Sequence, residues 1–102
     1  GCGLLLDINN IEVSATNLGL DAAAMVDAID PALVGEVHLA GHAREDHEHG
    51  PLLIDDHGSK VSPVTWQLFE RFLLGSGPVP VLIEWDTNVP DFQDLLAEAQ
   101  VA

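Results

Sequence analysis

The sequence is poor in basic residues, with 3 Lys and Arg side chains against 17 Asp and Glu in 102 residues, and its formal net charge is −14. Nucleic acid is therefore a poor partner, because neutralising phosphates requires Lys and Arg. Anionic membrane surfaces are excluded on the same ground. Although much of this charge can serve solubility alone, the favoured partners are cations, either metal ions or a basic protein or peptide.

Cysteine is almost absent, since Cys2 is the single one. One cysteine excludes an internal disulfide and a thiolate-rich metal site, and we expect Cys2 to be a small core residue. No apolar run approaches the length of a membrane span and no secretory signal is visible, so we expect a cytoplasmic protein. The sequence also lacks a Ser-His-Asp arrangement, a phosphate-binding glycine-rich loop and an HExxH motif.

Apolar residues make up 47% of the chain, which argues against disorder despite the charge. The length allows one domain, and we expect residues 1–102 to form a single α/β domain. Gly1-Cys2-Gly3 leads directly into an apolar run. Because a native N-terminus seldom begins inside a buried strand, we expect the chain to be a C-terminal fragment of a larger protein.

Four apolar runs each end in residue types that bind metal ions. An unbroken apolar run is typical of a strand buried on both faces, as in parallel sheets. A carboxylate or imidazole at its end is costly unless it is paired, coordinated or exposed. The four runs are Leu4–Leu6 before Asp7, Glu36-Val37 before His38, Leu52–Ile54 before Asp55-Asp56-His57, and Val79–Ile83 before Glu84.

The sequence predicts strands alternating with helices, which indicates parallel pairing and an α/β architecture. Polar stretches at 11–19 and 42–51 are predicted to be loops. Asp21 and Ser62 are predicted helix N-caps, and the last helix is expected to bury Phe92, Leu95, Leu96 and Ala99. The predicted strands are 3–7, 34–40, 52–55 and 79–84, and the predicted helices are 22–29, 63–74 and one that starts at Pro90-Asp91.

The carboxyl ends of parallel strands form the functional face of such folds. Side chains at these ends, together with an inward-facing His38, can converge on one mouth. Imidazole and carboxylate ligands without cysteine suit Fe, Mn or Zn, and several carboxylates can bridge more than one ion. The residues placed at the strand ends are Asp7, Asp55, Asp56, His57 and Glu84.

Each candidate also has a purely structural interpretation. Asp7 before Asn9-Asn10 could form an Asx-turn, and His38 alone is more often a hydrogen-bonded core histidine than a ligand. Residues 55–58 could be a polar turn, and residues 84–86 could be a strand end with an ion pair, although cations are scarce. Taken together, the four strand ends favour the metal site.

The histidines of the polar stretch are weaker candidates. His42 lies near a strand end and is a second-tier ligand candidate. His47-Glu48-His49 resembles a chelating tract, but its polar surroundings favour an ordinary solvated loop.

Four segments of the chain carry a resemblance to a known family and occur in that family's order: Leu4–Asn10, Glu36–His42, Leu53–His57 and Leu82–Asp86. They resemble the multinuclear non-haem iron-dependent oxidases, a family that includes the methanobactin-biosynthesis oxidase and many uncharacterised bacterial proteins. The resemblance implies a TIM-type (β/α)8 barrel, similar to xylose-isomerase-like barrels, with two or three iron ions that use dioxygen to modify residues, often cysteine, of a ribosomal precursor peptide. A separate partner protein usually presents that peptide.

The resemblance also implies a ligand set, including one asparagine that the residue patterns alone do not select. Asn10 is favoured for that ligand and Asn9 is second tier. Members often carry Thr where this chain has Asp56, so Asp56 is not counted. The implied iron ligands are Asp7, Asn10, His38, Asp55, His57 and Glu84.

The resemblance implies a barrel of eight strands, of which this chain would supply about the last four. We therefore expect the fragment alone to be inactive, with further ligands in the missing half. Open sheet edges invite oligomers or pairing with another chain. Two alternatives stay open: a Mn- or Zn-dependent isomerase or hydrolase on the same barrel, and an inactive metal-binding or interaction module.

Overall fold

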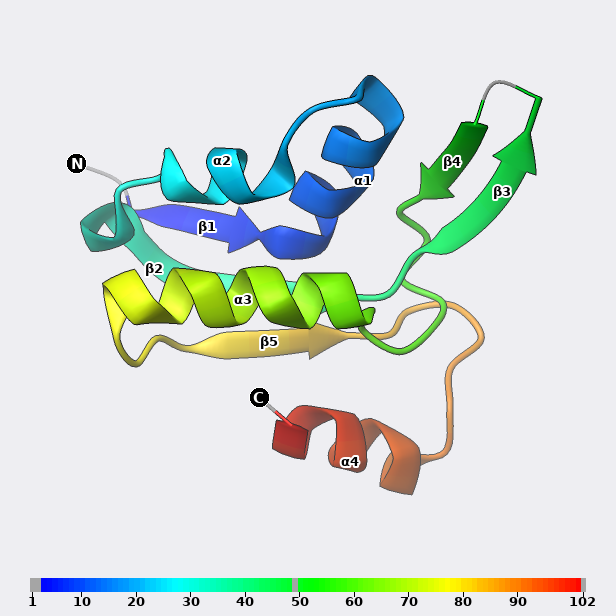
Figure 1. Ribbon diagram of the computed structural model, residues 1–102. Helices are drawn as coiled ribbons and strands as arrows, with labels where there is room; N and C mark the ends of the chain where they lie inside the picture. The colour runs from blue at the N-terminus through cyan, green and yellow to red at the C-terminus, as the bar shows by residue number, and fades with distance from the viewer. Residues whose placement is uncertain (1–2, 49, 102) are drawn as a thin grey trace.

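A three-stranded parallel sheet forms the centre of the protein. The computed structural model describes residues 3–48 and 50–101. Strands β1 (Leu4–Asp7), β2 (Val34–Ala40) and β5 (Val81–Glu84) lie in the order β1-β2-β5, and both pairings are parallel. Their carboxyl ends therefore point to the same edge of the molecule (Figure 1).

Helices connect these strands, as the predicted alternation requires. They are α1 (Ile8–Leu18), α2 (Ala22–Asp27), α3 (Pro63–Ser76) and α4 (Phe92–Val101), with a short 3-10 turn at Pro31–Leu33. The predicted caps are confirmed: Asp21 accepts a hydrogen bond from the Ala24 backbone N–H, and Ser62 accepts one from Thr65. Such caps satisfy backbone donors that the first turn leaves free.

The hydrophobic core lies between one face of the sheet and the helices. Val37 and Leu39 of β2 are fully buried there, against Leu68 and Phe72 of α3. Because side chains alternate along a strand, Glu36 and His38 belong to the opposite face. The expectation of strands buried on both faces is wrong for the described chain, since its helices cover only one.

The uncovered face combines polar and apolar side chains. Leu5 of β1 and Leu82 of β5 are 57% and 45% exposed, respectively. Asp7, His38 and Leu82 are register neighbours across the three strands. This face therefore carries two predicted site residues next to exposed leucines.

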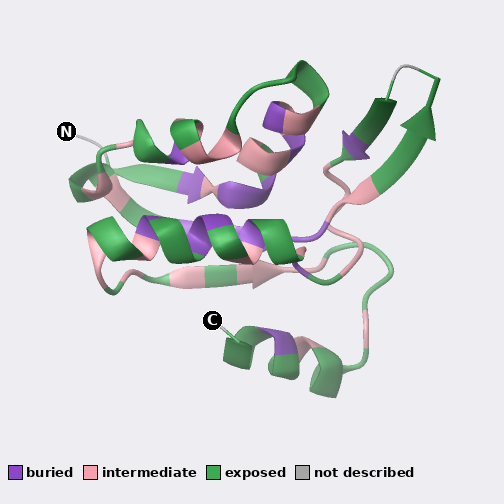
Figure 2. Ribbon diagram, in the orientation of Figure 1, coloured by how far each residue is buried: buried purple, intermediate pink, exposed green. Residues whose placement is uncertain are grey.

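An antiparallel hairpin stands beside the sheet. It consists of β3 (Ala43–His47) and β4 (Gly50–Ile54), which form a separate two-stranded sheet (Figure 1). The prediction of a loop at 42–51 is therefore wrong. The strand predicted at 52–55 is present as β4, but its pairing is antiparallel instead of parallel. Strand β3 is mostly polar and exposed (Figure 2), so its sequence shows no alternation of apolar and polar residues. Its pairing with β4 defines it as a strand.

Residues 11–19, also predicted to be a loop, form most of α1. Asp7 caps this helix by accepting a hydrogen bond from the Asn10 backbone N–H, and Gly19 ends it with φ 69°. Ile8, Val13 and Ala15 are buried. Tertiary burial thus outweighs the weak helix propensity of the Ser, Thr and Asn residues in this segment.

The C-terminal helix α4 lies apart from the core and is mostly exposed (Figure 2). Phe92 and Leu96, predicted to be buried, are 71% and 39% exposed. The buried residue is Glu98, whose carboxylate accepts a hydrogen bond from the Val61 backbone N–H at 3.1 Å. Ala99, also predicted to be buried, is exposed and Leu95 is half-buried, so the described elements cover the predicted apolar stripe of α4 only in part.

Two predictions fall on positions outside the described residues, namely the core role of Cys2 and the loop role of His49. Among the helices of residues 3–48 and 50–101, none has both the length and the apolar character of a membrane span.

Candidate metal centre

Three side chains reach the site from the parallel sheet. Asp7 ends β1 and pairs in register with His38 of β2. Glu84 ends β5 and pairs with Ala40, two residues beyond His38. The His38 Nδ1 contacts Glu84 Oε1, and its Nε2 lies 3.5 Å from Glu36 Oε2. The face opposite the core therefore gathers an imidazole and several carboxylates.

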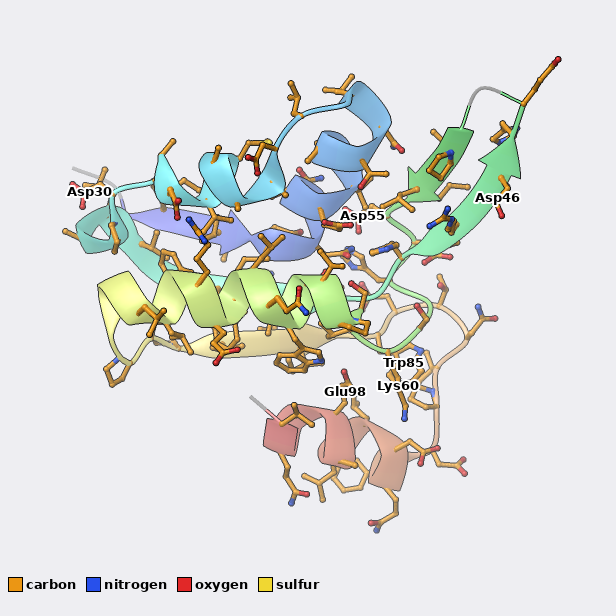
Figure 3. All side chains as sticks on the ribbon, in the orientation of Figure 1. Asp30, Asp46, Asp55, Lys60, Trp85 and Glu98 are labelled. Carbon is orange, nitrogen blue, oxygen red and sulfur yellow. The ribbon has the colours of Figure 1, made fainter. Side chains whose placement is uncertain are left out.

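Two more side chains enter from the segment that follows the hairpin. Asp55 comes directly after β4, at the base of the hairpin (Figure 3). The His57 Nε2 lies 2.8 Å from Asp55 Oδ1. The His57 Nδ1 lies 3.1 Å from Glu84 Oε2 and 2.9 Å from Asp86 Oδ2. His57 thus links the hairpin segment to the end of β5.

His57 adopts a left-handed backbone conformation, with φ 50°, which is uncommon for a non-glycine residue. Its carbonyl accepts hydrogen bonds from the backbone N–H groups of Asp86 at 2.7 Å and Thr87 at 3.2 Å. The Thr87 hydroxyl donates to the Asp56 carbonyl at 2.9 Å. The segment after β5 therefore holds His57 in this conformation.

The Asp56 side chain faces its own turn. Its Oδ1 accepts a hydrogen bond from the Gly58 backbone N–H at 3.0 Å. Asp56 belongs to neither of the ligand groups that the described residues form. The structure thus places Asp56 as a turn residue beside the site.

The electrostatic environment of His57 favours a positive charge. Partial burial alone would lower the pKa of His57. The hydrogen bond with Asp86 and the charges of Asp55, Glu84 and Asp7 outweigh that effect, and the pKa is raised above its ordinary value. The same carboxylates would attract a metal cation.

Asn9 and Asn10 of α1 differ in whether their side-chain amide groups are available to bind a metal ion. Asn9 is fully buried, and its amide group contacts Gly41, Asp55 and His42. Asn10 is exposed, and its Nδ2 donates to Asp55 Oδ2 at 3.3 Å. Among the described residues this hydrogen bond engages the amide nitrogen of Asn10, so its side-chain carbonyl oxygen is available as a ligand.

The remaining histidine candidates lie differently. Within residues 3–48 and 50–101, His42 reaches the site through Asn9, at 2.8 Å. His47 is on the exposed strand β3 and contacts Glu45 at 3.2 Å. His49 falls outside the described residues. The structure therefore brings His42, but not His47, next to the candidate ligands.

The donor chemistry suits a metal ion. Single ligand atoms of Asp7, Asp55 and His57 lie within 4.8 Å of one another, and so do those of His57, Glu84 and Asp86. Ligands on opposite sides of one ion are separated by about twice a metal–ligand distance of about 2.0–2.2 Å. Two adjacent groups that share His57 fit a centre with nitrogen and oxygen ligands, the donors that Fe, Mn and Zn accept.

Asp86 was missed as a candidate. In the sequence it appeared only as part of a strand end with an ion pair. Its spacing of two from Glu84 is the signal that could have identified it, because alternate residues of an extended segment share a face.

The fold and this cluster define an α/β protein with a candidate metal centre rich in carboxylate and histidine. Comparison with known sequences is more specific: the chain belongs to the MbnB/TglH/ChrH family, whose model, described as RiPP precursor modification enzyme, matches residues 1–102. The family is thus one that modifies ribosomally made precursor peptides.

Bacterial relatives named UPF0276 proteins agree with this assignment. The relative in Acaryochloris marina is 50% identical over 101 residues, which are 99% of this chain and 35% of the relative. In Rhizobium meliloti the identity is 48% over 103 residues, covering 100% and 33%. In Bordetella pertussis it is 52% over 99 residues, covering 96% and 34%. The chain spans about a third of the length of these curated relatives.

Proposed function

We propose that the chain is part of an iron-dependent oxidase that uses dioxygen to modify residues, often cysteine, of a ribosomal precursor peptide. The observation that carries this proposal is the convergence of Asp7, His38, Glu84, Asp55 and His57 on one edge of the protein. Membership of a precursor-modifying family supports the peptide substrate.

We further propose that the full protein is a TIM-type barrel. Residues 1–102 would form a single α/β unit that contains the last strands of this barrel. The parallel order β1-β2-β5 and the helices on one face of the sheet support this proposal. In such a barrel the uncovered face, with Asp7 and His38, would point into the interior. The rest of the barrel would supply further ligands, so the fragment alone would be inactive.

The proposed iron ligands are Asp7, Asn10, His38, Asp55, His57 and Glu84, with Asp86 beside them. Iron bound there would supply dioxygen activation and one-electron chemistry. The number of acidic side chains suits two or three ions, because one carboxylate can serve two metals.

The protein groups would bind and orient the reactants. The segment after β5 fixes His57, and Asn9 and Asn10 donate to the two oxygens of Asp55. The carboxylates hold negative charge at the strand ends, where a precursor peptide would enter. The chain's net charge of −14 favours a basic peptide or a basic partner protein that presents it.

The test is dioxygen consumption by the full-length protein, loaded anaerobically with iron, with and without the precursor peptide from a neighbouring gene. The proposal predicts consumption that depends on both iron and peptide, together with a mass change in the peptide. Turnover of a sugar or phosphate with Mn or Zn, without dioxygen uptake, would instead identify an isomerase or hydrolase. Metal binding without any turnover would identify an inactive module.

A further inference from the structure

A chain of hydrogen bonds leads from His42 to the candidate ligand Asp55. The His42 Nδ1 lies 2.8 Å from Asn9 Oδ1, and Asn9 Nδ2 donates to Asp55 Oδ1 at 2.6 Å. The same Nδ2 donates to the carbonyl of Gly41 at 3.1 Å. Asn9 is fully buried, so it cannot exchange these partners for water.

These contacts fix the orientation of the Asn9 amide. Both the Gly41 carbonyl and the Asp55 carboxylate are acceptors, and an amide NH2 group has two hydrogens to give them. The flipped amide would turn its oxygen toward two other oxygens in a buried place, which costs free energy. Asn9 Oδ1 therefore faces His42.

The orientation of Asn9 in turn defines the role of His42. An amide oxygen only accepts hydrogen bonds, so His42 Nδ1 must carry a hydrogen. A nitrogen that bears this hydrogen has no lone pair for a metal. The Ser59 hydroxyl donates to the His42 carbonyl at 3.4 Å, which ties the backbone of His42 to the neighbouring loop.

These hydrogen bonds fix the orientation of the Asp55 carboxylate. Its Oδ1 accepts from Asn9 and faces His57 Nε2 at 2.8 Å. Among the residues that the structure describes, the contact to its Oδ2 is the longer one of 3.3 Å from Asn10. Holding Oδ1 leaves Oδ2 as the oxygen best placed to bind a cation. Outer partners of this kind orient metal ligands and set their affinity.

We propose that His42 is a positioning residue of the metal centre, which donates from Nδ1 to Asn9 and thereby orients the Asp55 carboxylate. The proposal rests on the proposed function, because it requires Asp55 to be a ligand. It replaces the interpretation of His42 as a ligand through Nδ1.

The first experiment measures metal affinity of the full-length protein by anaerobic titration with Co(II), followed by its absorption bands. His42→Leu removes the donor, and the affinity should fall about 10- to 100-fold. His42→Asn keeps an N–H donor near the position of Nδ1 and should stay within about threefold of the natural protein. His47→Leu, which removes an exposed histidine of β3, is the matched control and should change nothing.

Two affinity results would overturn the proposal. If His42→Leu binds Co(II) as the natural protein does, His42 positions nothing. If His42→Asn loses as much affinity as His42→Leu, the imidazole acts as a ligand or as a packing group.

The second experiment needs neither a variant nor a metal. Nitrogen NMR of the metal-free full-length protein, labelled at histidine, should find the hydrogen of the His42 ring on Nδ1. A neutral His42 ring with its hydrogen on Nε2 would overturn the proposal, even if His42→Leu fails to fold. Failure of the natural protein to bind Co(II) or iron would contradict the proposed function, whereas the NMR result tests the hydrogen-bond chain itself.

Discussion

Asp7 illustrates how one side chain can serve both the fold and the site. Its Oδ1 accepts the hydrogen bond that starts α1, from the Asn10 backbone N–H at 2.9 Å. A carboxylate has a second oxygen, which can still face a cation. The turn interpretation and the metal interpretation of Asp7 are therefore compatible.

Gly41 is the residue where a single added carbon should be most costly. A Cβ there would lie too close to the carbonyl and hydroxyl oxygens of Ser59 and 2.5 Å from the Lys60 carbonyl. Because two of these atoms are backbone, we expect Gly41→Ala to lower the free energy of unfolding by about 1–3 kcal/mol. Urea unfolding followed by circular dichroism measures this loss.

The matched control is Gly35→Ala in β2, where no heavy atom beyond Gly35 and its two chain neighbours lies within 4 Å of the added carbon. An equal loss in both variants would refute the close approach at Gly41.

For single residues, the sequence predicted most members of the candidate metal centre but not the hydrogen bonds that connect them. Asp7, Asp55, His57 and Glu84 could be chosen because polar residues after apolar runs need partners. The buried role of Asn9 could not, because its partners Gly41 and Asp55 are 32 and 46 residues away along the chain. Only the folded chain brings them together.

Among the elements, the hairpin depends on one side chain of α1. Asn17 donates to the Leu53 carbonyl at 2.9 Å and accepts from the Leu53 backbone N–H at 2.7 Å. Asn17→Ala would leave both backbone groups of β4 without this partner, at a cost of about 1–3 kcal/mol. Hydrogen exchange of the Leu53 amide should accelerate in this variant.

Asn17→Asp is the control that removes one of the two hydrogen bonds and keeps the other. Its carboxylate can still accept from the Leu53 N–H but cannot donate to the Leu53 carbonyl, so protection of that amide should be largely kept. Unchanged exchange in Asn17→Ala would contradict the proposed anchoring of the hairpin.

The contact between α2 and α3 should depend on pH. Arg71 donates two hydrogen bonds to Asp27, at 2.8 and 2.6 Å. The hydrogen bond from Arg71 and its positive charge outweigh slight desolvation and hold the pKa of Asp27 below its ordinary value. A carboxyl group with a lowered pKa stabilises the fold above its unfolded pKa, and this contribution is lost as pH falls through the folded pKa.

Asp27→Asn should therefore reduce the acid-induced loss of stability, measured as the urea midpoint at several pH values from neutral to acid. Both side chains are about half exposed, so the difference should be small and should shrink in high salt. Identical pH profiles for the two proteins would contradict this prediction.

Element types followed from the sequence where a cap or an apolar stripe marked them, as in α2 and α3. They did not where tertiary contacts decide. In α1, Ser, Thr and Asn residues of weak helix propensity obscured an apolar stripe formed by Ile8, Ile11 and Ala15. Strand β3 is polar on both faces and has no apolar periodicity to detect. The antiparallel pairing of β4 with β3 likewise depends on a strand that the sequence did not reveal.

For the whole molecule, the uncovered sheet face and the edges of β1 and β5 have a testable consequence, since neither edge pairs with a further strand of the described residues. Leu5 and Leu82 are about half exposed on that face. We expect residues 1–102, produced alone, to form oligomers or pair with other chains, since open edges and apolar surface favour association. Light scattering after size exclusion measures this, and a stable, monodisperse monomer would contradict it.

The central claim is that the strand ends of this chain hold iron, and metal analysis of the anaerobically loaded full-length protein tests it most directly. We predict bound iron in the natural protein and a clear loss of iron in both Asp55→Ala and His57→Ala, with His47→Ala as the control that keeps it. A natural protein that binds no iron, or Asp55 and His57 variants that bind as much as the natural protein, would contradict the claim.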